Sequence, residues 1–242
     1  MVSLCSVYKE LDFLPADAYA ARITALFETY GAGYDFASFW VQRIDGRPTA
    51  AISRVDGNMT LCCAENADFE ELACFISTVG YSSLTLDAAF LGQLGLTASK
   101  TSYTVRYEGE KLILNEEILD DYDKKSLYDL LGSCGFELGN YSDFLSDVCA
   151  RLNKGTASLA AIENETLDAC AFALFKGEKS VLLGAVATRN EARGKGYAST
   201  LVRSLAGRET ERKVYLFCRN DSLLEFYKKS GFVFCGKWAI VD

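Results

Sequence analysis

The chain has 242 residues, of which 50% are hydrophobic, and a chain of this length and composition can bury one large core or two modest ones. Its 25 Lys and Arg residues against 33 Asp and Glu residues give a net charge of −8, which disfavours nucleic acid as a partner because a phosphate backbone requires a positive surface. The lack of histidine excludes Ser-His and Cys-His nucleophile pairs and most zinc sites, so no metal site is expected.

Two further features of the composition bear on cellular location. The nine cysteines are odd in number and form no C-x-x-C pair, which favours reduced thiols in a cytosol. No apolar run approaches the length of a membrane span, and residues 1–14 carry acidic side chains and lack the apolar block of a signal peptide. We therefore expect a cytoplasmic protein that does not interact with a membrane.

The apolar pattern of the first half predicts an antiparallel meander with helices around it. The expected elements are a strand within residues 4–14, a helix over 16–30, strands over 36–44, 49–55 and 59–63, a helix over 68–79, and strands over 83–86 and 101–106. A short polar joint follows at residues 108–110.

The second half begins the same pattern again. The expected elements are a strand over 112–114, helices over 125–131 and 142–152, strands over 157–162, 169–175 and 180–188, a helix from 197, a strand over 214–218, a helix over 223–230 and a last strand from 232. Ser222 and Glu225 are expected to form a capping box for the last helix, which Gly231 ends. Because the two halves repeat one order of elements, we predict a mixed α/β (α+β) fold of two pseudo-repeated sheets flanked by helices.

The stretch over residues 180–207 predicts a buried strand, a tight turn and a helix. Gly194 and Gly196 lie at the entry to this helix, where backbone N–H groups have no internal partner and the helix macrodipole is positive. Glycines there let a pyrophosphate approach the backbone, and Arg193 and Lys195 add positive charge. A lone G-x-G is a weak signal that favours an ordinary strand-to-helix turn over ligand binding, so a second motif has to decide.

That second motif follows the next strand. The string V-A-T-R-N-E-A-R-G-K-G-Y-A from Val186 and the string N-D-S-L-L-E-F-Y-K-K-S-G-F from Asn220, in this order and spacing, resemble the GNAT superfamily of acyl-CoA-dependent N-acyltransferases. The match covers about the last quarter of the chain. It departs from the family pattern at Glu191, where Gln or Arg is favoured, and at Asn190, where Pro is frequent.

The resemblance implies a cofactor and a set of site residues. It implies that acetyl-CoA binds with its pantetheine arm along Val186, Ala187 and Thr188, with its pyrophosphate at Arg193, Gly194, Lys195, Gly196, Tyr197 and Ala198, and with a further contact from Asn220. It also implies that Tyr227 protonates the departing thiolate. Because the phosphate contacts are mainly to backbone, we expect the two departures to leave binding intact, although Glu191 weakens it by its charge.

The first half lacks these features. Residues 64–67 hold no glycine, the acidic residues Glu65, Asp68, Glu70 and Glu71 lie where phosphate would sit, and Leu91 aligns with the tyrosine. We therefore predict a degenerate GNAT-like domain without a cofactor loop over residues 1–110 and an acetyltransferase domain over residues 111–242. The alternative is an unrelated α+β domain fused to one GNAT domain.

Charge suggests a role for the first half. Residues 1–110 contain 7 Lys and Arg and 14 Asp and Glu, whereas residues 111–242 contain 18 and 19. We predict that the acidic half forms one wall of the acceptor pocket and attracts a cationic amine, the alternative being that its acidity serves only solubility.

The expected reaction is direct transfer of an acetyl group from acetyl-CoA to a primary amine on a small molecule or peptide. The sequence does not identify the base: Glu163, Glu165 and Asp168 are nearest along the chain, although a solvated role fits them better. Cys218 fits either the core or the site. Two other functions stay open, an aminoacyl transferase of the peptidoglycan-bridge type, which the net charge disfavours, and a non-catalytic CoA-binding module, which would not need Tyr227.

Overall fold

The computed structural model describes residues 1–110 and 118–242, so the strand expected over residues 112–114 lies outside the described residues. The first half contains β1 (Val2–Leu4), η1 (Tyr8–Leu11), α1 (Ala18–Tyr30), β2 (Ala37–Ile44), β3 (Arg47–Val55), β4 (Asn58–Cys63), α2 (Phe69–Val79), β5 (Ser83–Asp87), η2 (Ala88–Phe90), α3 (Leu91–Leu94) and β6 (Lys100–Tyr107). The second half contains α4 (Lys124–Ser133), α5 (Tyr141–Lys154), β7 (Ser158–Asn164), β8 (Thr166–Lys176), β9 (Ser180–Thr188), η3 (Asn190–Ala192), α6 (Tyr197–Arg208), β10 (Lys213–Cys218), α7 (Asp221–Lys229) and β11 (Phe232–Val241).

The first element differs from the expected strand within residues 4–14. β1 ends at Leu4, and the 3-10 turn η1 follows it. The Glu10 carboxylate accepts hydrogen bonds from the backbone N–H groups of Ser6 (3.0 Å) and Val7 (3.3 Å), which stabilises the turn. Local side-chain bonds of this kind compete with strand pairing, and the apolar pattern does not reveal them.

The strands form one mixed sheet of 11 strands in the order β1-β2-β3-β4-β5-β11-β6-β10-β9-β8-β7. In each half, three antiparallel strands are followed by a helix and a parallel strand: β2, β3 and β4 lead through α2 to β5, and β7, β8 and β9 lead through α6 to β10. The mixed α/β class and the repeated order are confirmed. The two expected sheets, however, are joined into one.

The joint between the halves is an exchange of their last strands. β6 lies between β11 and β10, and β11 lies between β5 and β6. The two exchanged strands pair antiparallel with each other from Phe232 opposite Tyr107 to Ile240 opposite Lys100, with a bulge near Cys235. Each half therefore supplies a strand to the sheet of the other.

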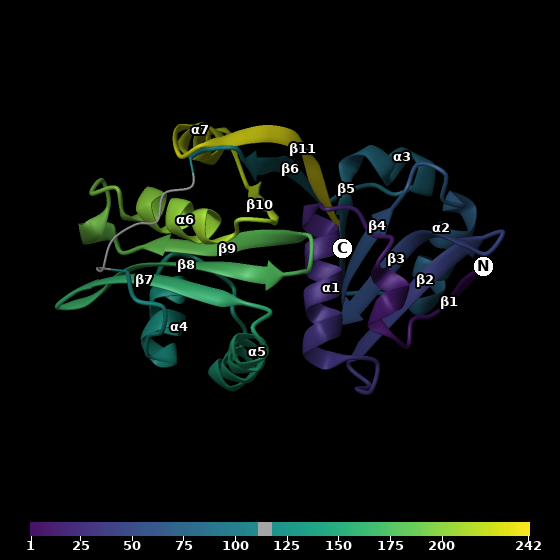
Figure 1. Cartoon of the computed structure of the whole chain (residues 1–242), viewed down its shortest axis with the longest axis horizontal. Helices are drawn as coiled ribbons and strands as arrows, with labels where there is room; N and C mark the ends of the chain where they lie inside the picture. Colours follow the sequence, from purple (N-terminus) through teal and green to yellow (C-terminus); the bar gives the residue numbers. More distant parts are fainter. Residues whose placement is uncertain (111–117) are drawn as a thin grey trace.

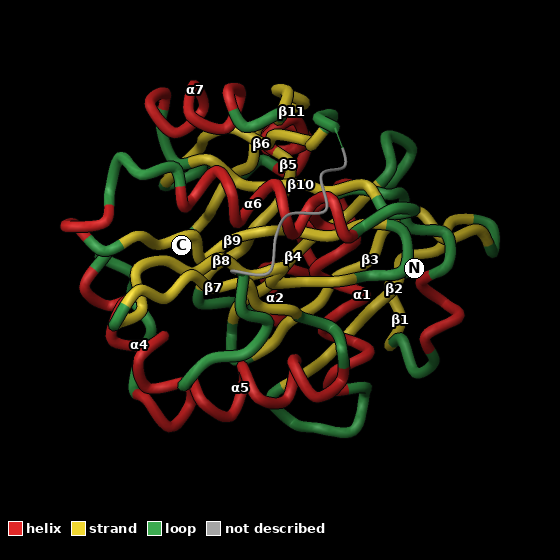
Figure 2. The backbone as a smooth tube through the Cα atoms, turned by 60° about the vertical axis from the view of Figure 1, so that its left-hand side comes forward, coloured by secondary structure: helices red, strands yellow, loops and turns green. Residues whose placement is uncertain are grey.

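Helices cover both faces of the second-half strands. Figure 1 shows α6 and α7 on one side and α4 and α5 on the other, with α1 between the two halves, and Figure 2 shows the same two layers from another direction. Ala18 and Ala21 of α1 pack on Leu182 and Tyr215 of the second half. The opposite side of α1 packs on first-half strands, so this helix belongs to both cores. None of the helices in residues 1–110 and 118–242 combines the length and apolarity that a membrane crossing requires.

Candidate active site

The candidate site is built on the strand, turn and helix that the sequence singles out. β9 ends at Thr188, a short turn follows, and α6 begins at Tyr197. Gly194 and Gly196 have φ angles of +79° and +85°, which strain any residue with a Cβ. A Cβ on either glycine would meet no described atom within 4 Å, so the space beside the turn is open.

The start of α6 carries unsatisfied backbone donors. Its N-cap is Gly196, which has no side chain to accept from the first turn, and that turn holds no acidic residue and only a partly buried Ala198. The start of α2 differs, because Asp68 accepts from the N–H of Glu71 (2.9 Å) and Glu70 lies beside it. The positive end of the macrodipole is therefore open in the second half and neutralised in the first.

β9 and β10 separate toward their carboxyl ends. They pair in parallel over residues 180–183 and 213–216. Beyond this point Ala185 has a φ angle of +48° and the register of β9 with β8 shifts, whereas the end of β10 pairs with β6. The side of residues 186–188 that faces β10 therefore has no strand partner in the described part of the chain. The resulting wedge leads to the glycine turn.

Side chains line the end of this wedge. Arg193 donates through Nε to the carbonyl oxygen of Thr188 (3.3 Å), and the Cys134 thiol donates to the same oxygen (3.5 Å). The Thr188 hydroxyl is buried and has no hydrogen-bond partner among the residues described. Lys195 Nζ lies 5.8 Å from the ring centroid of Tyr197 at the start of α6. Cations beside free donors suit an anionic ligand.

An ion pair between a buried carboxylate and a partly exposed arginine fixes the turn to the sheet. Arg189, directly after β9, donates to the Asp168 carboxylate on β8, which also accepts from Asn164 Nδ2 (2.9 Å). Asn164 Nδ2 lies 3.1 Å from Tyr197 Oη as well. The hydrogen bonds from Arg189 and then Asn164 lower the pKa of Asp168. With 4% exposure and these partners, Asp168 anchors the turn.

The other two carboxylates considered as bases lie around the turn between β7 and β8. Glu163 accepts a hydrogen bond from the Tyr122 hydroxyl (2.6 Å), and Glu165 occupies the turn with a φ angle of +63°. Both residues are exposed, in keeping with the solvated role that the sequence favours. Glu191 is also exposed, and its carboxylate lies 4.0 Å from Arg189 Nε.

Asn220 holds the start of α7. Its Oδ1 accepts from the backbone N–H of Leu223 (2.9 Å) and from the Ser222 hydroxyl (2.8 Å). The predicted capping box of Ser222 and Glu225 is therefore wrong, because Asn220 is an equally good N-cap and lies two residues after the end of β10. Since Oδ1 is engaged, only the amide nitrogen of Asn220 is left for a ligand.

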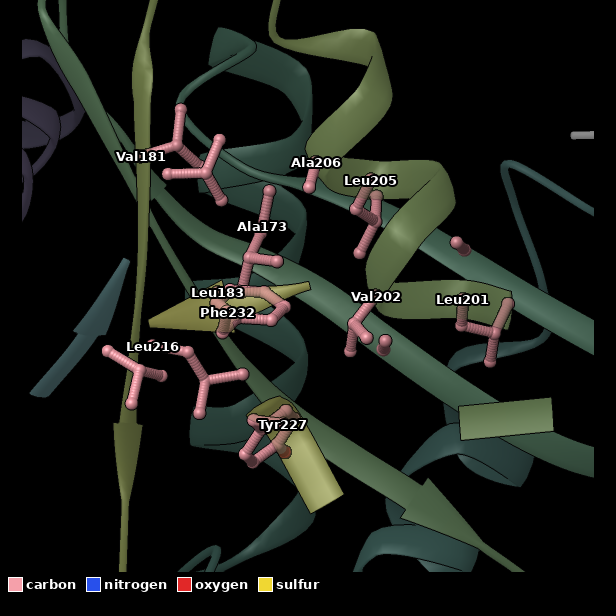
Figure 3. Close-up of a cluster of buried hydrophobic side chains, with 14 of the residues drawn as sticks. Ala173, Val181, Leu183, Leu201, Val202, Leu205, Ala206, Leu216, Tyr227 and Phe232 are labelled. Atoms are coloured by element: carbon pink, nitrogen blue, oxygen red, sulfur yellow. The ribbon is translucent and has the colours of Figure 1, made fainter. Parts of the chain in front are cut away.

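Tyr227 lies on α7 with its ring in the apolar cluster between α6, α7 and the sheet (Figure 3). The ring centroids of Phe226 and Phe232 are 5.0 Å and 5.7 Å away. Burial raises the pKa of the Tyr227 hydroxyl and the neighbouring Cys218 raises it further, against the opposite effect of Arg219. The hydroxyl is therefore protonated at neutral pH, the form that a proton donor needs.

Cys218 belongs to the same cluster. Burial, followed by the charge of Cys235, raises the pKa of the Cys218 thiol to about 12. A thiol with that pKa is not a nucleophile at neutral pH, so Cys218 is a core residue at the edge of the wedge.

A cavity of about 370 Å³ lies on the other face of the second-half strands. Phe172 of β8 and Ala185 of the β9 bulge form part of its wall, with Arg151 of α5 beside them. Asp56, in the turn between β3 and β4, and Asn58, at the start of β4, line it from the first half. The cavity is therefore shared by the two halves and reaches the bulge where the wedge opens.

The connection between α4 and α5 joins the cavity to the wedge. The Cys134 thiol in this connection donates its hydrogen bond to the Thr188 carbonyl oxygen at the end of β9. The ring of Phe136 lies 5.3 Å from the guanidinium of Arg219, the residue directly after β10. The next two residues, Glu137 and Leu138, line the cavity. Sequence reasoning missed these residues, because no local pattern marks side chains that meet only in the folded chain.

Residues 153–234 match the family model described as an acetyltransferase (GNAT) domain. The chain contains a GNAT domain. The match spans the wedge, the glycine turn, all of α7 and the first residues of β11. No curated protein sequence matches the chain.

Solved structures agree on the fold over the whole chain. A tandem GNAT protein from the clavulanic acid biosynthesis pathway has a TM-score of 0.62 at 12% identity, covering 99% of this chain and 97% of that one. A Drosophila protein has a TM-score of 0.64 at 11% identity, with 100% and 98% covered. An acetyltransferase of the GNAT family from Colwellia psychrerythraea has a TM-score of 0.57 at 10% identity, with 100% and 98% covered. At these identities the likeness is one of fold, and it includes a tandem GNAT fold.

Proposed function

We propose that the chain is an acyl-CoA-dependent N-acetyltransferase that moves an acetyl group from acetyl-CoA to a primary amine by direct transfer. The observation that carries this proposal is the wedge between β9 and β10, which leads to an open glycine turn at an uncapped helix start. Acetyl-CoA is an elongated molecule with a pyrophosphate, so both features are needed together.

Each part of the wedge has a role in binding. Unpaired backbone groups of Val186, Ala187 and Thr188 would hold the pantetheine arm by strand-like hydrogen bonds. The N–H groups of residues 194–198 would hold the pyrophosphate, with charge from Arg193 and Lys195. The amide nitrogen of Asn220 would add a further contact from the start of α7.

The chemistry needs three things from the protein. Bound acetyl-CoA supplies a thioester carbon, to which the neutral amine nitrogen bonds as the carbon–sulfur bond breaks. Backbone N–H groups near Thr188 would stabilise the negative charge that develops on the carbonyl oxygen. Tyr227 would donate its proton to the sulfur, and the proton that the amine loses would return through water to the tyrosine. Apolar surroundings raise the pKa of both the tyrosine hydroxyl and the departing thiol, so the two pKa values stay close enough for proton transfer.

The acceptor would reach the thioester from the shared cavity. In this proposal residues 111–242 form the acetyltransferase domain, and residues 1–110 form a degenerate GNAT-like domain that binds no cofactor and contributes Asp56 and Asn58 to the acceptor pocket. We keep the cytosol as the expected compartment, since nine thiols suit a reducing environment.

Thiol release from acetyl-CoA with a panel of small amines and short peptides tests the proposal. We expect acetyl-CoA to bind in calorimetry and at least one amine to accelerate thiol release. Tight binding without release for any amine would favour a non-catalytic CoA-binding module, and failure to bind acetyl-CoA would remove the wedge from consideration.

A further inference from the structure

The shared cavity continues into a second hollow that points to the class of acceptor. This wider hollow, of about 1120 Å³, has Asp56, Leu138, Asp143 and Asp147 in common with the cavity beside β9. The two spaces therefore form one groove. The groove runs from the β9 bulge to the surface between α1 and α5.

Aromatic rings line the far end of the groove. Tyr30, Tyr34 and Phe36 lie with their ring centroids between 5.1 Å and 6.5 Å from one another. Tyr34 is 56% exposed and Phe36 is 39% exposed, which is unusual for large rings that already touch each other. Asp56 lines the same hollow as these rings, and its backbone N–H donates to the carbonyl oxygen of Phe36 (2.9 Å). Ring faces beside a carboxylate favour a cation.

The groove carries an excess of negative charge. Four carboxylates, on Asp56, Glu137, Asp143 and Asp147, line it in its inner part against one guanidinium, on Arg151. Asp147 is engaged by Arg151 and by the Tyr30 hydroxyl (2.5 Å). Asp56 and Glu137 have no hydrogen-bond or ion-pair partner for their carboxylates in the described residues. Two free carboxylates, one from each half, thus face the same space.

Arg151 indicates that the inner cavity holds water or a hydrogen-bond acceptor. Its side chain packs over Phe175 with 9% exposure, and it lines the inner cavity. The Nε atom is buried and has no acceptor in the part of the chain that the structure describes. A buried donor next to an open space is satisfied by water or by an acceptor such as a neutral amine nitrogen, and not by an ammonium group.

We propose that the acceptor is a compound with two amino groups, of which one is acetylated at the β9 end and the other binds as a cation between Asp56 and the rings of Tyr34 and Phe36. This inference rests on the proposed function. The amine that attacks a thioester must be neutral, so carboxylates are of little use to that nitrogen and would hold it protonated. A second, distal ammonium group matches both the free carboxylates and the exposed rings.

Equilibrium binding to the full chain tests this directly. Putrescine and butylamine share a four-carbon chain and differ by one ammonium group. We expect putrescine to bind about fivefold tighter or more in calorimetry, and the preference to shrink as salt is raised. Asp56→Asn should weaken putrescine binding about twofold to fivefold, and Tyr34→Leu should have an effect of similar size.

Asp45→Asn is the matched control. Asp45 and Gly46 form a hairpin turn with φ angles of +51° and +77°, almost the same as +48° and +79° at Asp56 and Gly57, but Asp45 lines neither hollow. Asparagine tolerates this conformation, so both variants should fold. Equal affinity for the two amines, or equal effects of the two variants, would overturn the inference. If monoamines still accelerate thiol release in that case, the proposed function stands. If putrescine binds selectively but no amine causes thiol release, both the proposed function and the ligand's role as acceptor are overturned.

Discussion

The hydroxyl of Tyr227 is the group on which the proposed acid step depends. Tyr227→Phe should lower turnover with an accepted amine by about 10²–10⁴ and leave acetyl-CoA affinity unchanged, because the proton is needed only as the thiolate leaves. Burial raises the pKa of this hydroxyl above its ordinary value, so wild-type turnover should not fall as the pH rises through about 10. Steady-state rates over a pH series and calorimetry measure both.

Tyr107→Phe is the control for this variant. The Tyr107 ring packs on Phe232 at 5.1 Å, much as Tyr227 does at 5.7 Å, but its hydroxyl donates to the backbone carbonyl of Glu110. Removing this second hydroxyl should leave turnover nearly unchanged. If both variants keep full turnover, Tyr227 is an aromatic wall of the core and another group protonates the thiolate.

Substitution of Gly196 tests whether the turn binds the pyrophosphate of acetyl-CoA. Gly196→Val should reduce acetyl-CoA affinity strongly, since the side chain would enter the open space at the helix start. A β-branched residue at a φ angle of +85° also costs about 1–3 kcal/mol of stability. Gly95 ends α3 with a left-handed backbone conformation, a φ angle of +64° and open space beside it. Gly95→Val therefore carries a similar strain and should keep its affinity for acetyl-CoA. Equal affinity losses in both folded variants would mean that strain alone is responsible.

At the scale of elements, the turn after β9 depends on the ion pair between Asp168 and Arg189. Asp168→Asn should lower the free energy of unfolding by about 1–3 kcal/mol at pH 7, because a charged hydrogen bond to a buried carboxylate is lost. The folded-state pKa of Asp168 lies below its ordinary value of about 4, so the pair contributes fully above that value and is lost as the pH falls through the folded-state pKa. Urea unfolding at pH 7 and at acid pH measures this.

The exposed pair between Asp120 and Arg208 is the comparison. Its carboxylate is 71% exposed and 2.6 Å from the guanidinium, so Asp120→Asn should have little effect at either pH. A loss of stability in Asp168→Asn that is the same at acid pH as at pH 7 would show that side-chain packing, and not the charge, is what Asp168 contributes.

The strand, turn and helix around Gly194 could be predicted because their signals are local. The apolar run of β9, the glycines and the helical spacing after Tyr197 lie within one continuous stretch. The cap of α7 was missed because Asn220 and Ser222 are both good caps two residues apart, and only the end of β10 decides between them. The groove could not be predicted, since Asp56 and Asp143 come together only when the two halves pack.

At the scale of the whole molecule, the sequence predicts strands but not their neighbours. Periodicity identifies β6 and β11 as strands in equivalent places of the two halves. No local sequence pattern indicates that β6 pairs with β10 of the second half, or that β11 pairs with β5 of the first half. The alternative, in which each half closes its own sheet, has the same apolar pattern and differs only in contacts between distant residues.

The strand exchange predicts how the two halves depend on each other. A fragment of residues 111–242 lacks β6, which pairs with both β10 and β11, so both would become open sheet edges prone to aggregation. It also lacks α1, which covers Leu182 and Tyr215, and it lacks Ala16, whose backbone carbonyl accepts a hydrogen bond from the Tyr215 hydroxyl (2.5 Å). We therefore expect either half alone to be insoluble or unfolded.

Coexpression of residues 1–110 with residues 111–242 should restore the fold. The break lies outside the paired strands, so β6 and β11 can still pair across eight registered positions and hold the two fragments together. The fragments should copurify at equal ratio, show a cooperative thermal transition by circular dichroism and bind acetyl-CoA with nearly the affinity of the intact chain. A soluble, monomeric fragment of residues 111–242 that binds acetyl-CoA at full affinity by itself would show that the shared strands are dispensable. That result would make the second half an independent domain, and it would remove the physical reason for the first half to persist as part of the same sheet.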